Sequence, residues 1–413
     1  MNKGLDYLFG ITAGDRDGDA PGVISLARQW AAKEVIGNRL DYQRNYAALF
    51  EDKARVLALN MGLQRLAVPE DQGGFGWQGP NHAADIAAVL SEVGRADSST
   101  GILLALNYVL FSVLTRFSEG RAGFVEAVAT SYLEDELKIA SCILPGPGSV
   151  GEETPLFKGR SILARVKAHE SGFVISGADL RPFAAGLKAD LLLVVCADER
   201  GRPCIAVVPG DAPGVERGRG LLTTGLNALA NADISFVEAE IKQENLIQEP
   251  EAIPLLFTLL NLFLGGVSLG AGMNFFEILL DWSDSRIICG ATPLKENPLC
   301  ASVLADAAEE IACSRLLLDG LARLVSPCRS VQPLDTEGLY TYAVMIDARV
   351  QQSIMRAINR GMELMGSAGY AKEWHAEKHW RDVKTIQSLL CGVGAEAPAK
   401  MDTARFFCDC KEI

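Results

Sequence analysis

His375 and His379 stand four residues apart with Glu377 between them, an arrangement that could bind a metal ion. Zinc proteases use the order H-E-x-x-H, in which the glutamate directly follows the first histidine. Here the order is H-x-E-x-H, which favours a packing or solvated role for both imidazoles. We therefore predict no metal site. Arg381 and Asp382, which follow closely, are most simply interpreted as an ion pair or a cap at a helix boundary.

The ten cysteines form no pattern of the kind that binds zinc or predicts disulfides. Most of them lie scattered in apolar runs, where a thiol behaves as a small hydrophobic group. Cys408 and Cys410 are close together, but no second pair completes a zinc site. The first residues lack the apolar core of a secretory signal, so we expect reduced thiols and a cytoplasmic location.

Length and charge exclude several classes of protein. A chain of 413 residues is too long for one ordinary hydrophobic core, so two or three domains are expected. The composition, 49% hydrophobic and 22% charged, is typical of a soluble globular protein. A formal net charge of −13 argues against nucleic acid, whose phosphates require a basic surface, and against an anionic membrane.

One segment, residues 252–276, has no charged side chain and could be taken for a transmembrane helix. Pro254 interrupts its start, Asn261 lies within it, and four glycines dilute its apolar content. We therefore interpret it as a helix that is buried on all sides within a large helical assembly.

Periodicity divides the chain into three parts. Apolar residues recur every three or four positions within residues 1–135, which predicts an N-terminal α-helical domain. Residues 136–250 contain short β-rich runs at hairpin-like intervals, which predict a middle antiparallel β-barrel or sandwich domain. Residues 251–413 are predicted to form a C-terminal up-and-down four-helix bundle, with long helices over 254–283, 298–324, 336–365 and 398–410. The expected fold class is thus α+β and multidomain.

Several short motifs occur in a fixed order along these parts. Residues 69–76 read PEDQGGFG, and residues 97–101 read DSSTG at the start of a predicted helix. Residues 365–370 read MGSAGY and precede Arg381-Asp382, while Arg286 and Gly290 are spaced as in an R-x-x-F-G motif. Together these segments resemble the PEEYGGLG, GGxGY, RD and RxxFG motifs of the acyl-CoA dehydrogenase family, over nearly the whole chain.

The resemblance implies a flavoprotein in which FAD lies between the β-domain and the bundle. A neighbouring subunit completes the adenosine site in this family, so it implies a homo- or hetero-oligomer, most simply a homotetramer built as a dimer of dimers. The substrate would be an acyl-CoA or acyl-carrier thioester, with an electron-transfer flavoprotein as a possible partner. Its chemistry needs a base that removes the α-proton of the thioester and a flavin that accepts a hydride from the β-carbon.

The residue expected to be that base is not an acid. Counting from Arg381-Asp382, the glutamate of the family falls on Leu390, or on Cys391 after a shift of one residue. A second location used in the family falls near Leu259, with no acid between Glu251 and Glu277. Candidate substitutes are Asp97, at the start of a predicted helix that the resemblance places under the acyl pocket, and Glu396 or Asp402 beyond the lost position.

The flavin contacts differ as well. Ile143 stands where the family has a hydrogen-bonding threonine, and Phe183 falls in the stretch that replaces its W-I-T strand. The resemblance also assigns cofactor contacts to residues around the bundle, of which Cys289 replaces a phenylalanine and Asn297 and Glu363 replace glutamines: Arg286, Cys289, Asn297, Glu363, Gly366 and Ser367. A carboxylate at Glu363 would repel the pyrophosphate, so weak FAD binding is expected.

Three functions remain open from the sequence. The first is an FAD-dependent oxidoreductase that desaturates an acyl thioester at the α,β bond with a non-standard base. The second is a catalytically inactive subunit that pairs with an active homologue, which the loss of both the base and several flavin contacts would predict. The third is a relative of flavin monooxygenases, which would need the flavin site but not the glutamate.

Overall fold

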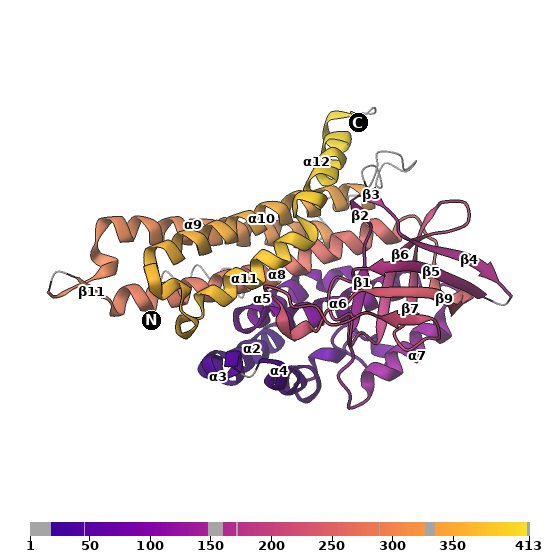
Figure 1. The fold of residues 1–413 in the computed structure, drawn as a ribbon, viewed down its shortest axis with the longest axis horizontal. Helices are drawn as coiled ribbons and strands as arrows, with labels where there is room; N and C mark the ends of the chain where they lie inside the picture. The colour runs from indigo at the N-terminus through magenta and orange to yellow at the C-terminus, as the bar shows by residue number, and fades with distance from the viewer. Residues whose placement is uncertain are drawn as a thin grey trace.

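The structure is a computed structural model that describes residues 18–44, 46–147, 160–170, 172–288, 290–326 and 335–410. Helices from both ends of the chain pack together beside a curled central sheet (Figure 1). This arrangement confirms the predicted fold class. The described N-terminal helices are α2 (Ala20–Trp30), α3 (Arg39–Arg44), α4 (Tyr46–Arg55), α5 (Ala83–Ala96), α6 (Ser98–Arg116) and α7 (Ala122–Leu133).

The strands lie in the middle of the chain. The main sheet has the order β10-β7-β6-β4-β5-β9-β8, with β1 also paired to β6, and two short pairs, β2–β3 and β11–β12, lie outside it. The strands are β1 (Ala140–Ile143), β2 (Gly146–Pro147), β3 (Arg160–Ser161), β4 (Ala164–His169), β5 (Gly172–Leu180), β6 (Leu191–Ala197), β7 (Pro203–Pro209), β8 (Val215–Arg217), β9 (Ile234–Lys242), β10 (Leu246–Ile247), β11 (Ile287–Ile288) and β12 (Thr292–Pro293).

The main sheet is mixed rather than purely antiparallel, which corrects the sequence-based prediction. Strand β6 pairs in parallel with both β1 and β4, while its pairing with β7 is antiparallel. The reason is that β6 does not follow β5 as its hairpin partner: the chain crosses back and places β6 beside β4 instead. Hairpin-like spacing in the sequence cannot distinguish these two routes.

Strand β6 joins two hydrophobic cores. Side chains alternate across a strand, and all seven residues of β6 are buried. Leu191, Leu193 and Val195 belong to the main core that the sheet shares with the helices. Leu192, Val194 and Cys196 belong to a second core enclosed within the curled sheet. This double burial explains the continuous apolar run LLLVVCA, which replaces the usual alternation of polar and apolar residues.

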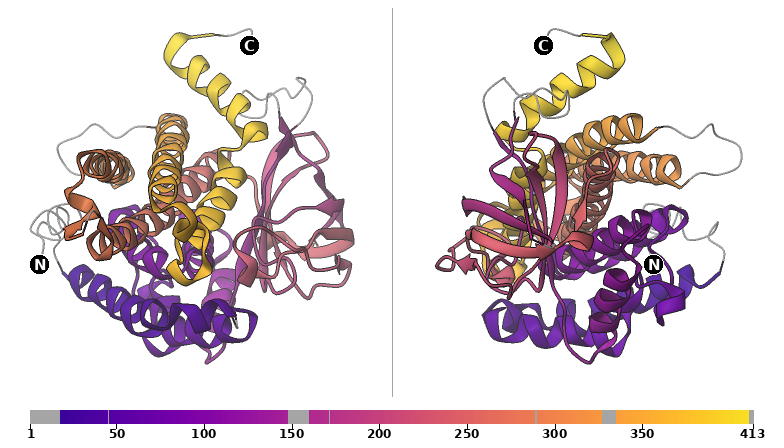
Figure 2. Two further views of the ribbon diagram at one scale, coloured as in Figure 1. Left: turned by 60° about the vertical axis from the view of Figure 1, so that its left-hand side comes forward. Right: turned by 90° about the vertical axis from the view of Figure 1, so that its right-hand side faces the viewer.

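The C-terminal helices form the bundle, in which α8, α9, α10 and α11 pack side by side while α12 projects from the body (Figure 2). Their bounds are α8 (Ala252–Ser285), α9 (Pro298–Val325), α10 (Thr336–Met365), α11 (Ala376–Leu390) and α12 (Val393–Cys408). Helix α11 was not among the four long helices predicted for the bundle. Helix α12 begins five residues before the predicted start and accommodates Pro398 within it.

The long apolar segment is the central helix of the assembly. Helices α6 and α8 are long and apolar enough to cross a membrane, but 94% and 89% of the residues in their most apolar windows are buried inside the protein. Helix α8 packs against helices from both ends of the chain, including α5, α6, α9 and α10. The prediction of a helix buried within a helical assembly is therefore confirmed.

Glycines allow α8 to approach α5 closely. A Cβ atom on Gly270 of α8 would lie 1.9 Å from the carbonyl oxygen of Ser91, and one on Gly94 of α5 would lie 2.3 Å from the carbonyl oxygen of Val267. These distances are far below van der Waals contact, so a larger residue on either helix would force the helices apart.

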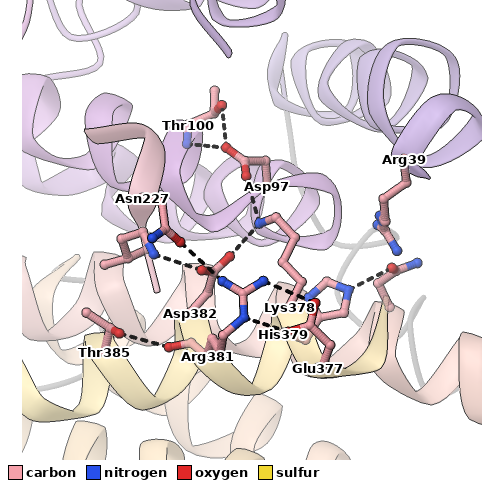
Figure 3. Close-up of polar contacts among 12 residues, drawn as sticks. Arg39, Asp97, Thr100, Asn227, Glu377, Lys378, His379, Arg381, Asp382 and Thr385 are labelled. Atoms are coloured by element: carbon pink, nitrogen blue, oxygen red, sulfur yellow. Dashed lines mark hydrogen bonds and ion pairs between the residues drawn. The ribbon is translucent and has the colours of Figure 1, made fainter. Parts of the chain in front are cut away.

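Lys378 joins three separate segments through a buried ionic cluster (Figure 3). Its ammonium group lies 3.0 Å from Asp97 at the start of α6 and also contacts Asp382, one turn along α11. Asp382 in turn accepts a hydrogen bond of 2.8 Å from the backbone of Leu226, in the loop that precedes β9. Burial alone would lower the pKa of Lys378, but the two carboxylates overcome this effect and hold its pKa above the ordinary value.

We predict opposite effects for two Gly→Ala substitutions in long helices. Gly270→Ala should destabilise the protein by about 1–3 kcal/mol or more, because the methyl group overlaps the backbone of α5. Gly320→Ala should stabilise it by about 0.5–1 kcal/mol, because Gly320 lies within α9 and faces open space. Urea unfolding of both variants tests this expectation. Equal effects would show that the two helices are not in the close contact described.

A second prediction concerns the buried cluster. Lys378→Met should cost about 3–5 kcal/mol of unfolding free energy, because two buried carboxylates would lose their cation. Lys400→Met is the matched control, since Lys400 forms an exposed pair with Glu396 at the same four-residue spacing and should contribute less than about 1 kcal/mol. Thermal and urea unfolding would reveal the difference. A cost for Lys378→Met no greater than the control would refute the role of the cluster.

Candidate functional site

A cavity of about 300 Å³, here called the inner cavity, lies between the end of β1, β2 and the bundle. Helices α8, α10, α11 and α12 and the loop before α12 contribute its other walls. Most of its lining is apolar, and no carboxylate is among the described residues that line it: Leu144, Pro145, Gly146, Arg160, Phe257, Asn261, Tyr340, Val344, Ser388, Leu389, Leu390, Gly392, Gly394, Ala395 and Ala399.

Leu390, at the position of the family glutamate, forms part of this wall and is buried. Asn261 and Phe257, from the first turns of α8, lie across the cavity. The amide of Asn261 donates a hydrogen bond of 2.7 Å to the carbonyl of Phe257, within its own helix. The inner cavity therefore has a mostly apolar lining that suits an acyl chain, without an acid among its described lining residues.

A larger cavity of about 560 Å³, here called the outer cavity, adjoins the inner one at Tyr340, which lines both. It lies between the β6–β7 hairpin and the starts of α8 and α10, and it contains several charged side chains. Arg202 pairs with Asp198 at 2.7 Å, and Arg405 pairs with Asp402 at 2.8 Å. Glu251 and Glu337 add two further acids to the lining.

A buried polar cluster lies where the two cavities adjoin. Asp402 lies 2.9 Å from the guanidinium of Arg160 and accepts a hydrogen bond of 2.7 Å from the hydroxyl of Tyr340. Burial raises the pKa of Asp402 above its ordinary value, although Arg160 opposes this shift. Asp402 was a candidate base from the sequence. The structure places it in the lining of the outer cavity, bound to Arg160 and Arg405, rather than on the wall of the inner cavity.

Asp97, the other candidate base, has a structural position. Its carboxylate accepts hydrogen bonds of 2.8 Å from the backbone and the hydroxyl of Thr100, which makes it the N-cap of α6. It also binds Lys378, as described above, and lines neither cavity. The capping role that is usual for aspartate at a helix start is therefore what the structure shows.

The histidine motif has no metal-binding geometry in the described part of the chain. His375 precedes α11 with a left-handed backbone, and His379 is buried with its Nε2 atom 3.0 Å from the side-chain oxygen of Asn274. Burial and the nearby Arg39 and Lys378 hold the pKa of His379 well below its ordinary value. The predicted packing role is thus confirmed for His379.

Arg381 and Asp382 each form an ion pair, but neither lies at a helix boundary, which corrects that part of the interpretation. Both lie within α11, where each contacts a residue one turn earlier. Arg381 binds Glu377 and also donates to the carbonyl of Thr224 at 3.0 Å, while Asp382 binds Lys378. The interpretation failed because α11 was not expected, so the i, i+4 partners were not considered.

The residues assigned to FAD fall into two separate groups. Ile143 and Phe183 lie near the inner cavity end of the molecule, whereas the others lie around the far end of the bundle, where α8 ends, α9 begins and α10 ends. Arg286 lies 29 residues beyond Phe257 on α8, roughly 44 Å along the helix at about 1.5 Å per residue. The two groups cannot line one pocket within a single chain. Cys289 lies outside the described residues.

The far group is solvent-exposed or partly exposed. Arg286, Glu363, Gly366 and Ser367 are exposed, and Glu363 forms a surface pair of 3.3 Å with Arg360. Asn297 caps α9 by accepting hydrogen bonds from the backbone of residues 299 and 300. These side chains are accessible to a neighbouring chain, and the family resemblance implies that such a chain completes the adenosine site.

The near group does not fit the flavin ring that the resemblance implies. Ile143 is packed in the second hydrophobic core and Phe183 in the main core, and neither side chain carries a hydrogen-bond donor. The adjacent hydroxyl of Ser141 is directed to the carbonyl of Ala184. The described side chains at these positions thus supply no polar contact to a flavin.

Sequence reasoning missed one buried acid in this region, Asp347. Its side chain has no solvent exposure, accepts a hydrogen bond of 3.0 Å from Gln351, and lies 3.4 Å from the thiol of Cys391. A signal was present, because Asp347 follows Tyr340 and Val344 at helical spacing along the apolar face of a predicted helix. Acids are rare on such a face, so the sequence itself marks this position as unusual.

Comparison with known proteins shows which family and which proteins this chain is similar to. Residues 262–390 match the family described as acyl-CoA dehydrogenase, C-terminal domain. Cyclohex-1-ene-1-carbonyl-CoA dehydrogenase of Syntrophus aciditrophicus is 22% identical over 373 residues, which cover 88% of this chain and 84% of that protein. The mitochondrial short-chain specific acyl-CoA dehydrogenase of Homo sapiens is 22% identical over 378 residues, which cover 88% and 85%.

A solved structure agrees with the sequence relatives. Butyryl-CoA dehydrogenase from Megasphaera elsdenii superposes with a TM-score of 0.77 at 17% identity, over 95% of this chain and 99% of that one. At this identity the likeness establishes the fold alone. The matched domain, the relatives and the fold together confirm the resemblance to the acyl-CoA dehydrogenase family that the sequence motifs indicated.

Proposed function

We propose that this chain works as an acyl-CoA dehydrogenase-type oxidoreductase that binds an acyl thioester. The observation that carries the proposal is the pair of adjoining cavities that meet at Tyr340. The acyl group would occupy the inner cavity, against Phe257, Val344 and Leu389, because apolar surface there is removed from water on binding. The polar arm of the thioester would extend through the outer cavity.

The charge of the outer cavity bears on the carrier of the acyl group. Four acids and two arginines line it, which gives a formal charge of −2 (2 − 4) among the described lining residues. This excess of negative charge is unfavourable for the phosphates of coenzyme A. An acyl group on the phosphopantetheine arm of a carrier protein has one phosphodiester in place of the three phosphates of coenzyme A, which would reduce that repulsion. We therefore expect acyl-pantetheine to bind at least as well as the matching acyl-CoA.

FAD, if it is used, should be held weakly and across two chains. The exposed far group around Arg286 would serve a neighbouring chain, consistent with an assembly of the dimer-of-dimers type. The near group offers no side-chain donor to the ring. Electrons would leave through a separate partner, for which an electron-transfer flavoprotein is the expectation in this family.

A second function is favoured by the lining of the inner cavity. No described residue that lines it is a carboxylate, and both flavin-ring positions are buried in hydrophobic cores. A chain of this kind could serve as the inactive subunit of a heteromeric dehydrogenase, contributing its exposed far group to the cofactor site of an active homologue. No observation here favours the flavin monooxygenase alternative.

The proposal predicts a measurable flavin response. The purified protein should contain less than one FAD per chain, should take up added FAD, and should lose visible flavin absorbance when an acyl thioester is added without oxygen. FAD counted after denaturation, and spectra recorded with short acyl-CoA and acyl-pantetheine panels, test these points together.

A protein that stays colourless in excess FAD would contradict the oxidoreductase proposal and favour the inactive subunit. Co-expression with a homologue that retains the glutamate would then be the deciding measurement. Recovery of a mixed oligomer with bound FAD would establish the subunit role, and Arg286→Ala in this chain should lower its FAD content.

A further inference from the structure

Asp347 differs from every other buried acid in the described part of the chain. The buried acids are Glu92, Asp97, Asp347, Asp382 and Asp402. Four of them pair with a lysine or an arginine within 3.0 Å. Asp347 alone is paired with no cation, and its described partners are the amide of Gln351 and the thiol of Cys391. A fully buried carboxyl without a cation is costly and requires an explanation.

Its position relates it to the inner cavity. Tyr340 and Val344 on α10 line the cavity, and Asp347 is the next residue on the same face of that helix. On α8, Phe257 and Asn261 line the cavity and Gly265 is the next in the same series. Asp347 on α10 and Gly265 on α8 thus each lie one helical turn beyond the residues that line the cavity.

Gly265 leaves the space that the carboxyl occupies. A Cβ atom on Gly265 would lie 3.0 Å from the Oδ1 atom of Asp347, which is closer than ordinary contacts. The absence of a side chain on α8 therefore lets an acid fit between two closely packed helices. A Cβ atom there would also lie 2.7 Å from Cδ2 of Leu318 on α9, so a larger residue at 265 would displace both side chains.

Cys391 connects the carboxyl to the cavity wall. Its thiol lies 3.4 Å from the Oδ2 atom of Asp347, and its neighbours in the chain, Leu390 and Gly392, both line the cavity. Cys391 is partly exposed, whereas Asp347 has no exposure. Cys391 and Asp347 are not themselves among the described lining residues, so the thiol is the partly exposed member of the pair and adjoins the lining along the chain.

The pKa values of Asp347 and Cys391 suit the transfer of a proton. Burial raises the pKa of Asp347 to about 7, against which the hydrogen bonds from Gln351 and Cys391 act only in part. The carboxyl is thus poised near neutral pH, where a general base is most effective. Burial and the facing Asp347 hold the pKa of Cys391 above its ordinary value, so the thiol keeps a proton unless it passes one on.

We propose that Cys391 and Asp347 form a proton relay that replaces the missing glutamate. The α-carbon–hydrogen bond of the thioester breaks and its proton passes to the sulfur of Cys391, while the S–H proton moves to the carboxylate of Asp347. The electron pair stays on the thioester as an enolate, so no oxidant is needed for this step. Gln351 orients the carboxylate. The inference rests on the proposed binding of an acyl thioester.

The test is exchange of the α-proton, which is independent of any cofactor. The full-length protein is incubated with butyryl-CoA or butyryl-pantetheine in D₂O, and deuterium at the α-carbon is followed by mass spectrometry. We expect exchange above the buffer rate, a loss of about 100-fold or more in Asp347→Asn, and a similar loss in Cys391→Ala. Glu92→Gln is the matched control, because Glu92 is a buried acid remote from both cavities, and should retain exchange.

Restoring the family acid provides an independent variant. Leu390→Glu added to Asp347→Asn should recover exchange, because an acid at 390 faces the cavity directly. Absence of exchange in the wild type, or exchange unchanged in Asp347→Asn, would overturn the relay. Flavin reduction without α-proton exchange would also overturn the relay, but it would leave the oxidoreductase proposal intact. Exchange without flavin reduction would support the relay and count against the oxidoreductase.

The pH dependence of stability gives a readout that does not depend on a ligand. The folded pKa of Asp347 is about 7 and the unfolded value is about 3.9. Between these values the folded chain binds more protons, so the contribution of Asp347 to stability is fully present below about pH 4 and is lost as pH rises toward 7. The melting temperature of Asp347→Asn relative to the wild type should therefore rise across this interval and level off above it.

Glu92→Gln should show the opposite trend. Burial alone would raise the pKa of Glu92, but Arg28 and Arg95 hold it below its ordinary value. The stability that Glu92 contributes is therefore present above its unfolded pKa of about 4.3 and lost as pH falls below it. If the melting temperatures of Asp347→Asn and the wild type changed with pH in parallel, the pKa of Asp347 would not be raised in the folded chain as the relay requires.

Discussion

The ammonium group of Lys378 is the contact on which the arrangement of the three parts depends. It binds Asp97 at the start of α6 and Asp382 on α11, and Asp382 holds the loop at Leu226. All three charged groups are almost fully buried, so each has lost its hydration and is stable only in the presence of the others. The cluster fixes the start of α6 and the helix that ends at Leu390 relative to each other. It therefore determines where the inner cavity can form.

Close packing provides the second constraint. Helix α8 contacts α5 through backbone atoms at Gly94 and Gly270, and it contacts α10 at Gly265. Hydrophobic burial brings these helices together, but the glycines determine how near they come. Because α8 is fixed on both sides, Phe257 and Asn261 at its start have defined positions in the cavity wall. The same tight spacing leaves Asp347 enclosed between α8 and α10.

Most of the fold could be predicted from the sequence, because it depends on local patterns. Long helices such as α8 and α10 show in the apolar periodicity, and the β-rich runs locate β6 and β7. What the sequence could not give was pairing at a distance. The parallel partners of β6 depend on a crossover, and Lys378 lies 281 residues away from its partner Asp97 in the sequence. The helix α11 was missed because its His and Arg-Asp residues were interpreted as motifs rather than as one amphipathic segment.

The candidate site was predictable in location but not in chemistry. Counting from Arg381-Asp382 placed Leu390 at the base position, and the structure does place this leucine in the cavity wall. The acids suggested as substitutes, Asp97, Glu396 and Asp402, have cations as partners, and such pairing weakens a base because it stabilises the charged form. Asp347 was not considered: its place on an apolar helix face marks it as unusual, but the sequence does not show that Gly265 of α8 lies opposite it. A base must be both near the substrate and free of a cation, and both conditions are properties of three-dimensional packing.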